Sequence, residues 1–180
     1  MLANRILLMG LDDMPGQGAN PGASSLAVAN NIVPLFWLLG FSEDNLALLP
    51  LDEETPEGYP ILVDRIDHVA ERFSGRLDRF SELIGLEWHS LFDQWKCFLD
   101  ETGEPVLAVE TFEYWQQFDD SGALLNQLQG QLRAIDHLMR QPIADAESLL
   151  TLLGPCEMID EHHRIHPTEI QLAGYGWSQS

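Results

Sequence analysis

The strongest constraint in this sequence is a helical repeat of apolar residues in the stretch from Leu62 to Ile84. The apolar positions follow one another at steps of three and four residues, which places them on one face of an α-helix: Leu62, Ile66, Val69, Phe73, Leu77, Phe80 and Ile84. The same spacing predicts a second helix over Glu87–Leu99 and a third over Ala123–Arg140, which Pro142 ends. Helices therefore dominate the predicted fold.

Shorter apolar segments between these helices are predicted to be strands. They are Arg5–Gly10, Leu46–Leu49 and Val106–Phe112, and the last has the β-branched content typical of a strand. A chain of 180 residues is long enough to bury a core without disulfides. We therefore predict an α+β fold, a helix-dominated single domain with a small sheet, spanning residues 1–180.

Proline, glycine and capping residues mark the remaining segments. Residues 12–25 and 50–60 are predicted to be loops, and residues 171–180 to be a flexible tail. Two shorter segments are predicted near the N-terminus: Leu26–Asn30, capped by Ser24 or Ser25, and Leu35–Leu39, between Pro34 and Gly40. Two more are predicted near the C-terminus: the helix Ala146–Leu153, capped by Asp145, and the segment Glu157–His166, before Pro167.

The net charge excludes several classes of partner. Nine Lys and Arg stand against 29 Asp and Glu, so the formal charge at pH 7 is −20. Nucleic acids and anionic membranes both require a basic face, so we expect neither as a partner. A basic protein partner or a cation is compatible with this charge, and the alternative is that the charge serves only solubility. The candidate contact residues are Asp52, Glu53, Glu54, Glu57, Asp100, Glu101, Asp119 and Asp120.

Cationic side chains are few and unevenly placed. Lys96 is the only lysine and does not follow a glycine, which excludes the phosphate-binding loop that ends in Gly-Lys-Ser/Thr. Half of the arginines lie within the helix predicted over residues 62–84: Arg65, Arg72, Arg76 and Arg79. Two interpretations stay open for them, a solvated charged face or an internal clamp that binds acidic groups.

The two cysteines, Cys97 and Cys156, form no Cys-x-x-Cys pair. No secretory segment and no apolar run long enough to cross a bilayer is visible, so we expect a cytoplasmic protein with reduced thiols. Cys97 lies between Trp95 and Phe98 in a predicted apolar helix. We therefore expect both thiols to be buried rather than reactive.

A histidine-rich segment near the C-terminus is the candidate metal site. It contains His162, His163 and His166, and on a helix His162 and His166 would share one face. Pro167 would end such a helix at His166, and the segment lacks the His-Glu-x-x-His pattern of metalloproteases. A solvated polar segment and a pH-sensitive contact are the alternatives to metal binding.

No motif in the chain identifies a reaction or a cofactor. Gly16, Gly18 and Gly22 follow the first predicted strand, but their spacing differs from that of a dinucleotide-binding loop. The chain also lacks the Gly-x-Ser-x-Gly sequence of the hydrolase nucleophile elbow. We therefore expect no cofactor and favour a protein that is not an enzyme.

The start of the chain resembles a group of uncharacterised bacterial proteins. Ala3-Asn4-Arg5-Ile6-Leu7-Leu8, followed by Asp12, Asp13 and Pro15-Gly16, is similar to that group's opening Met-Ala-Asn-Arg-Ser-Tyr-Leu-Tyr and its later Asp and Pro-Gly. Val33-Pro34-Leu35 is similar to the group's Ile-Pro-Leu helix start, so the resemblance covers about the first 40 residues. Some members look like the small acidic immunity proteins that accompany bacterial toxins. The resemblance implies no activity and carries over no functional residue.

Three functional hypotheses remain. The first is a non-enzymatic acidic protein that captures a basic protein partner, as an immunity protein or an inhibitor does. The second is a metal-binding protein or metal-dependent enzyme that uses His162, His163 and His166. The third is an oligomeric structural protein without chemistry, in which some of the five Trp and eight Phe form an exposed interface. The sequence leaves the identity of any partner and the oligomeric state open.

Overall fold

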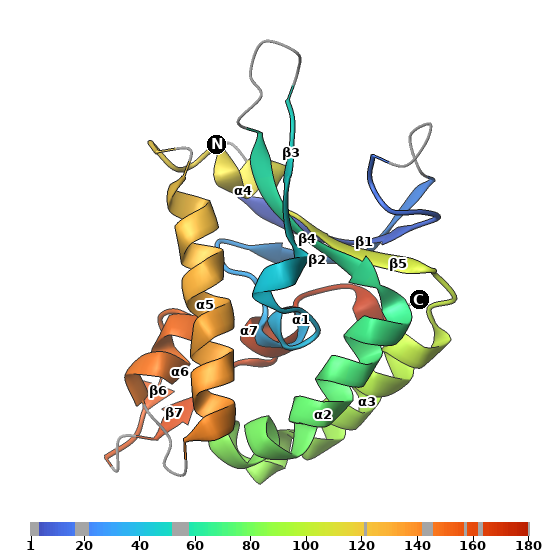
Figure 1. Cartoon of the computed structure of the whole chain (residues 1–180). Helices are drawn as coiled ribbons and strands as arrows, with labels where there is room; N and C mark the ends of the chain where they lie inside the picture. The colour runs from blue at the N-terminus through green and yellow to red at the C-terminus, as the bar shows by residue number, and fades with distance from the viewer. Residues whose placement is uncertain are drawn as a thin grey trace.

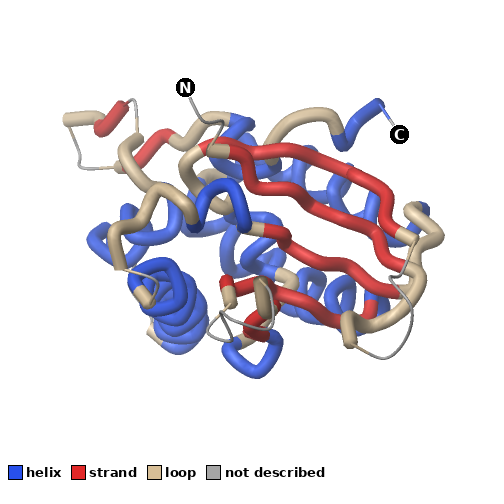
Figure 2. Tube along the Cα trace, turned by 90° about the horizontal axis from the view of Figure 1, so that it is seen from above, coloured by secondary structure: helices blue, strands red, loops and turns tan. Residues whose placement is uncertain are grey.

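An antiparallel sheet with helices against one of its faces forms the fold (Figures 1 and 2). The structure is a computed structural model, and it describes residues 4–16, 22–51, 58–120, 122–141, 146–156, 158–161 and 164–179. The α+β class predicted from the sequence is confirmed, and helix exceeds strand among the described residues.

Among the described residues, the main sheet has five strands, each antiparallel to its neighbours. In their order across the sheet they are β2 (Ala23–Asn30), β1 (Arg5–Leu11), β5 (Val106–Glu110), β4 (Tyr59–Arg65) and β3 (Leu46–Leu49). The register between β1 and β2 shifts between Leu8 and Met9. The strands predicted over residues 5–10, 46–49 and 106–112 are therefore confirmed, although β5 ends two residues earlier.

Most of the described helices lie below the sheet in the view of Figure 1, and the short helix that follows β5 lies level with the strands. They are α1 (Leu35–Leu39), α2 (Ile66–Ile84), α3 (His89–Glu101), α4 (Phe112–Trp115), α5 (Ala123–Arg140), α6 (Ala146–Leu153) and α7 (Glu169–Ala173). Short 3-10 turns occur at Glu43–Asn45 (η1), Leu86–Trp88 (η2) and Trp177–Gln179 (η3), and β6 (Met158–Ile159) pairs with β7 (Ile165–His166). No helix in the described ranges combines the length and the hydropathy that a membrane span requires.

Helix α1 lies at the centre of the hydrophobic core, with α5 on one side and α2 and α3 on the other (Figure 1). All five of its side chains are buried, which is the pattern of a helix surrounded by protein. The Trp37 indole donates a hydrogen bond of 2.9 Å to the carbonyl of Ala173 in α7. The predicted bounds of α1, between Pro34 and Gly40, are confirmed.

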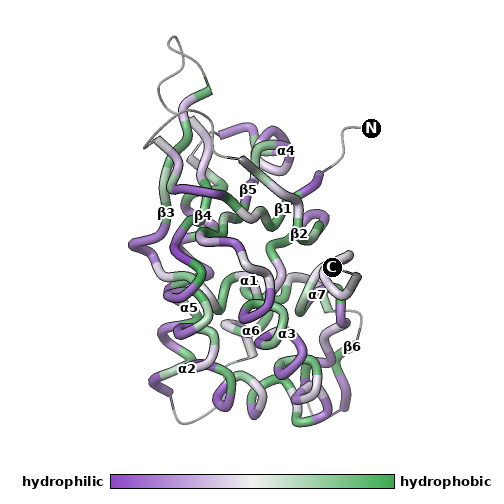
Figure 3. Tube along the Cα trace, turned by 90° about the vertical axis from the view of Figure 1, so that its right-hand side faces the viewer, coloured by the Kyte–Doolittle hydropathy of each residue, from purple (hydrophilic) through white to green (hydrophobic). Residues whose placement is uncertain are grey.

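Alternation along the strands gives the sheet two apolar faces. Ile6, Leu62 and Val109 point toward the helices and join the main core. Residues on the opposite face form a smaller buried cluster: Leu11, Ile61, Val63, Val106 and Ala108. This second face is turned toward the viewer in Figure 2, where most of the helices lie behind the strands. Hydropathy alternates along α2 and α5, in keeping with their amphipathic sequences (Figure 3).

The prediction of a helix over residues 62–84 is wrong for its first four residues. Leu62–Arg65 belong to β4, which pairs with β3 and β5, and α2 begins at Ile66. Leu62 and Ile66 are both apolar and four positions apart. An inward-facing residue of the strand therefore continues the helical spacing by coincidence.

Residues 23–30 form a strand, where the sequence predicted the end of a loop and a capped segment. Strand β2 is rich in Ala, Ser and Asn, which have little preference for strands. It nevertheless pairs with β1 along its length. Pairing with a buried neighbouring strand has therefore overridden the local preference of these residues.

The segment predicted to be a flexible tail packs against the sheet and α3. Tyr175 forms an antiparallel bridge with Val28 through two backbone hydrogen bonds, of 3.0 and 2.7 Å. Trp177 is buried, and its ring packs edge-on against the rings of Trp95 and Phe98. Trp177 thus forms part of the core, and the predicted flexible tail is wrong for this segment.

Candidate functional site

The acidic residues predicted as contact groups lie at separate places in the fold. Asp100 and Glu101 end α3, whereas Asp119 and Asp120 lie between α4 and α5, beyond the opposite end of β5 (Figure 1). All four are exposed, and none forms an ion pair with another described residue. The remaining predicted contact residues lie outside the described residues: Asp52, Glu53, Glu54 and Glu57. The described members of this set therefore do not form one patch.

The arginines of α2 bind backbone carbonyls in the interior. Arg76 donates hydrogen bonds of 2.9 and 2.8 Å to the carbonyls of Leu39 and Phe41, where α1 ends. Its side chain is only 12% exposed, and it also contacts Asp136 of α5 at 3.3 Å. The last carbonyls of a helix have no partner within that helix, so a buried helix end needs donors from elsewhere. Arg76 supplies those donors to α1.

Arg72 and Arg79 have the same kind of role. Arg72 donates to the carbonyl of Gly40 at 3.3 Å and to the carboxylate of Asp64 at 2.7 Å. Arg79 donates at 3.0 Å to the carbonyl of Leu138, near the end of α5. The interpretation as a solvated face is therefore wrong for Arg72, Arg76 and Arg79, whereas Arg65 is exposed and pairs with Asp67 at the surface. The interpretation as an internal acidic clamp is correct only in part, because most of their acceptors are carbonyls.

Most of the cations at the surface are also engaged within the molecule. Four arginines each pair with one carboxylate, in the ion pairs Arg5–Glu113, Arg65–Asp67, Arg133–Glu43 and Arg164–Asp160. Each of these pairs takes up a single negative charge. Because the α2 arginines point inward, few cations remain at the surface to balance the net charge of −20.

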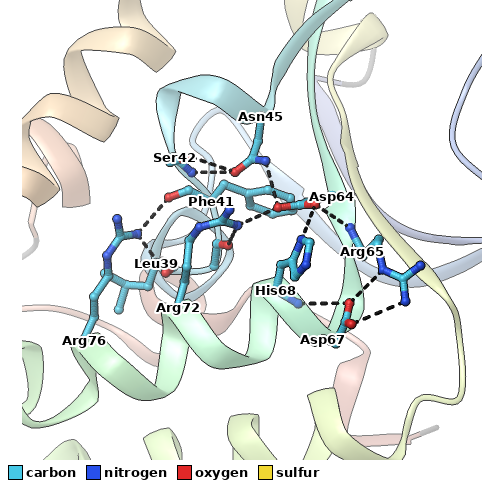
Figure 4. A network of polar contacts seen from close by, with 11 residues as sticks. Leu39, Phe41, Ser42, Asn45, Asp64, Arg65, Asp67, His68, Arg72 and Arg76 are labelled. Atoms are coloured by element: carbon cyan, nitrogen blue, oxygen red, sulfur yellow. Dashed lines mark hydrogen bonds and ion pairs between the residues drawn. The ribbon is translucent and has the colours of Figure 1, made fainter.

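Asp64 is the centre of a polar network that joins β4, α2 and η1 (Figure 4). It accepts hydrogen bonds from Arg72 at 2.7 Å, the Asn45 amide group at 2.8 Å, the backbone amide of Arg65 at 2.8 Å and His68 at 3.1 Å. Burial alone would raise the pKa of Asp64, but the bonds from Arg72, the Arg65 amide and His68 hold it below the ordinary value. A carboxylate with so many internal donors is a structural group.

Glu110, at the end of β5, has the opposite surroundings. Burial raises the pKa of this carboxyl group, although the Phe112 amide, at 2.9 Å, and the Tyr59 hydroxyl donate hydrogen bonds to it. The nearby charge of Glu113 raises the pKa further. Burial and the charge of Glu110 in turn raise the pKa of Tyr59 to about 12, so Tyr59 stays a donor. Glu110 forms no ion pair with any described residue.

The ring of Tyr59, whose hydroxyl donates to this carboxylate, packs against two further partly exposed aromatic rings. The ring centroid of Tyr59 lies 5.2 Å from that of Phe112 and 6.3 Å from that of Trp115. Thr111 fixes α4 beside β4, because its buried hydroxyl donates to the carbonyl of Pro60. We refer to the four residues Tyr59, Glu110, Phe112 and Trp115 as the Glu110 surface.

The Glu110 surface has the components of a site for an organic cation. A carboxylate that is partly removed from water is destabilised in its charged form until a cation approaches it. Aromatic faces attract cations that lie within about 6 Å of the ring centroid. An arginine side chain can use both at once, because guanidinium stacks on rings and binds carboxylates through two parallel hydrogen bonds. Sequence reasoning missed this site, since Glu110 is one of 29 acids.

Of the predicted metal ligands, the described residue His166 lies in the strand β7 and not in a helix. The strands β6 and β7 form a hairpin, so the helical-face argument for His162 and His166 does not hold. His166 contacts Asp160 at 3.2 Å, and Asp160 also binds Arg164 at 2.8 Å. His162 and His163 lie outside the described residues. Within the described part of the chain, no group of three or more His, Cys, Asp and Glu side chains is placed to hold a metal ion.

The expectation that both thiols are buried is wrong for Cys97. Cys97 is free and exposed on α3, and Cys156 is free and half-buried, with a pKa raised by burial. Two positions along a helix correspond to a rotation of about 200°, so Cys97 points away from the side on which Trp95 is buried.

Comparisons of the chain with protein-family models, with curated proteins and with solved structures find no match. The geometry and charge of the sites described above are therefore the only indications of function.

Proposed function

We propose that this chain is a non-enzymatic acidic binding protein that captures a basic protein partner, in the manner of an immunity protein or an inhibitor. The observation that carries the proposal is the position of Glu110. Its carboxylate is half-buried, accepts hydrogen bonds from the Tyr59 hydroxyl and the Phe112 amide, and forms no ion pair with a described residue, while the Tyr59 ring packs against those of Phe112 and Trp115. A cation from a partner would supply the missing interaction.

The use of the arginines supports this proposal. Arg72, Arg76 and Arg79 bind mostly internal acceptors, and the only exposed carboxylates that the structure places against them are Asp136 and Glu82, so most of the described surface acids are left without these cations. A surface with an excess of one charge steers an oppositely charged partner toward it and raises the association rate. Asp119 and Asp120, which follow α4 along the chain, add negative charge near the Glu110 surface.

An arginine of the partner is the group that fits this surface best. Its guanidinium can stack on the rings of Phe112 or Trp115 and bind the Glu110 carboxylate at the same time. A lysine ammonium would gain the charge interaction but lacks the planar fork that permits both contacts. We therefore expect the partner to present an arginine at the centre of a basic face.

The proposal is tested by co-purification from the cells that produce the protein, at low salt, followed by affinity measurements on the partner identified. We expect a basic partner whose affinity falls by about tenfold or more with Glu110→Gln or Trp115→Ala. The double variant Asp100→Asn/Glu101→Gln is the matched control, since it removes two charges beyond the opposite end of β5 and should bind almost normally. Equal loss in the control, or the absence of a basic partner, would refute the proposal.

The pH dependence of binding provides a second test of the same proposal. A bound cation favours ionised Glu110, so protonation of this group weakens the complex. Because burial raises the pKa of Glu110, affinity should begin to fall at a higher pH than the titration of an ordinary glutamate would give. In Glu110→Gln this component of the pH dependence should disappear, whereas it should persist in Asp100→Asn.

The other two hypotheses stay predictions. Metal binding by His162, His163 and His166 is tested by elemental analysis of untagged protein, and assembly into an oligomer is tested by light scattering. The described residues provide no observation that favours either hypothesis over capture of a basic partner.

A further inference from the structure

A pocket of about 530 Å³ lies between α3, β2 and the C-terminal turn η3. Leu26, Phe98 and Trp177 supply its apolar lining, and Asp93, Cys97 and Glu101 are among its polar lining residues. It adjoins the end of α3, which precedes β5, whereas Glu110 ends β5 (Figure 1). The pocket is therefore separate from the Glu110 surface.

The aromatic part of the pocket wall is held in place by the core. The ring of Trp177 packs against that of Trp95, with centroids 5.2 Å apart and planes inclined by 69°. It packs against Phe98 in a similar way, at 5.9 Å and 68°. The backbone bridge between Tyr175 and Val28 holds this segment against β2. The pocket is thus preformed rather than made by a loose chain end.

The polar part of the wall is negative. Asp93, Cys97 and Glu101 follow one another at steps of four residues, which places them along one face of α3. Asp93 contacts His89 at 3.7 Å, and Glu101 forms no ion pair with a described residue. No arginine or lysine among the described residues lines the pocket. Two carboxylates and two aromatic rings therefore face the same space.

We propose that this pocket binds a small organic cation, an ammonium ion that carries an apolar or aromatic group. Its volume lies within the range of about 300–1,000 Å³ that is typical of small-molecule sites. The rings of Phe98 and Trp177 attract the ammonium and cover its apolar group, and Asp93 and Glu101 balance its charge. This is a ligand site additional to the surface proposed for the basic protein partner.

Cys97 provides a direct reporter, because it is an exposed thiol in the pocket wall. In a Cys156→Ser background it is the only thiol of the chain. Its thiolate attacks the sulfenyl sulfur of a methanethiosulfonate, which forms a disulfide and releases methanesulfinate. The measurement is the ratio of the reaction rates with the trimethylammonioethyl reagent and the sulfonatoethyl reagent.

We expect the cation-to-anion rate ratio to fall by about tenfold in Asp93→Asn/Glu101→Gln. The matched control, Asp119→Asn/Asp120→Asn, removes the same number of charges at the other end of β5 and should change the ratio little. An equal fall in both variants would show that only the net charge of the protein acts on the thiol. That result would overturn the proposal.

Protection of Cys97 tests occupancy of the pocket itself. Benzyltrimethylammonium should slow the reaction in a saturable way, whereas phenylmethanesulfonate and sodium chloride at equal concentration should not. Phe98→Leu keeps the apolar volume but removes the ring, and should weaken protection several-fold in protein whose circular dichroism is unchanged. A lack of saturable protection in the folded parent protein would refute the site. Stronger protection by a short arginine peptide would assign the pocket to protein side chains instead.

Discussion

Two carboxylates on the same sheet, Asp64 and Glu110, have opposite surroundings. Asp64 receives hydrogen bonds from a guanidinium, an amide side chain, a backbone amide and an imidazole, and its pKa is lowered. Glu110 receives two hydrogen bonds and no described cation, and its pKa is raised. We infer that the first carboxylate holds the fold together and that the second is available to a partner.

Asp64→Asn should destabilise the protein by about 2–3 kcal/mol at pH 7, because it leaves Arg72 without its carboxylate in a mostly buried network. The folded pKa of Asp64 lies below its unfolded pKa, so the ionised group stabilises the fold at neutral pH. This contribution is lost as the pH falls below about 4, toward the folded pKa. Urea unfolding should therefore show a smaller difference between the two proteins at pH 3 than at pH 7.

The matched control for this prediction is Asp67→Asn. Asp67 also pairs with an arginine, but this pair with Arg65 is exposed on both sides. We expect little change in the free energy of unfolding at either pH, since exposed ion pairs contribute little. An equal effect of the two substitutions, or an Asp64 effect that does not change with pH, would contradict the role assigned to the Asp64 network.

Glu110→Gln should leave the free energy of unfolding unchanged or increase it, although it weakens partner binding. The substitution keeps a polar group that can accept the hydrogen bonds of Tyr59 and Phe112, and it removes a charge that burial destabilises. Functional groups are often held at some cost to stability. Urea unfolding checks this, and a loss of more than about 1 kcal/mol would show that Glu110 is structural.

Among the helices, α1 and α2 depend on one another. Helix α1 has five residues and is buried, so its end carbonyls lie within the protein. Arg76 and Arg72 of α2 bind those carbonyls, and Arg79 does the same for α5. Helix α2 therefore holds its neighbours by hydrogen bonds from its polar flank as well as by its apolar face.

Arg76→Met should destabilise the fold by about 3 kcal/mol, because buried carbonyls of Leu39 and Phe41 would lose their donor. Arg76→Lys should recover only part of this loss, since an ammonium cannot reproduce the planar donor arrangement. Hydrogen exchange of the α1 amides should accelerate in both variants. The exposed pair of Arg133 with Glu43 makes Arg133→Met the control, and equal effects of the two methionine substitutions would contradict this account.

The elements that the sequence predicts well are those whose local pattern and tertiary contacts agree. Helix α5 has the predicted bounds, from Ala123 to Arg140, because its apolar stripe faces the core and Pro142 follows it. The predictions for β2 and for the start of α2 are wrong, because the conformation of both segments depends on pairing with neighbouring strands. Spacing along one helix likewise cannot show which carbonyls its arginines reach.

Across the whole molecule, the arginines of α2 are separated by depth from the exposed acids, whereas the other described cations lie at the surface. The α2 arginines lie inside or at the margin of the core, and exposed acids occur at both ends of β5. The sequence predicts the excess of acids but not this separation. It also predicts neither binding site, because Glu110 and the pocket around Cys97 acquire their character from residues far apart in the chain.

The measurement that tests the central proposal most directly is nuclear magnetic resonance of isotope-labelled protein during titration with a short Arg-Gly peptide. We expect the largest shifts at the amides of Tyr59, Glu110, Phe112 and Trp115 and at the Trp115 indole, with saturation that Glu110→Gln abolishes. Small shifts spread evenly over the exposed acids, or the largest shifts at Asp100 and Glu101, would contradict the proposal that the Glu110 surface receives the basic partner.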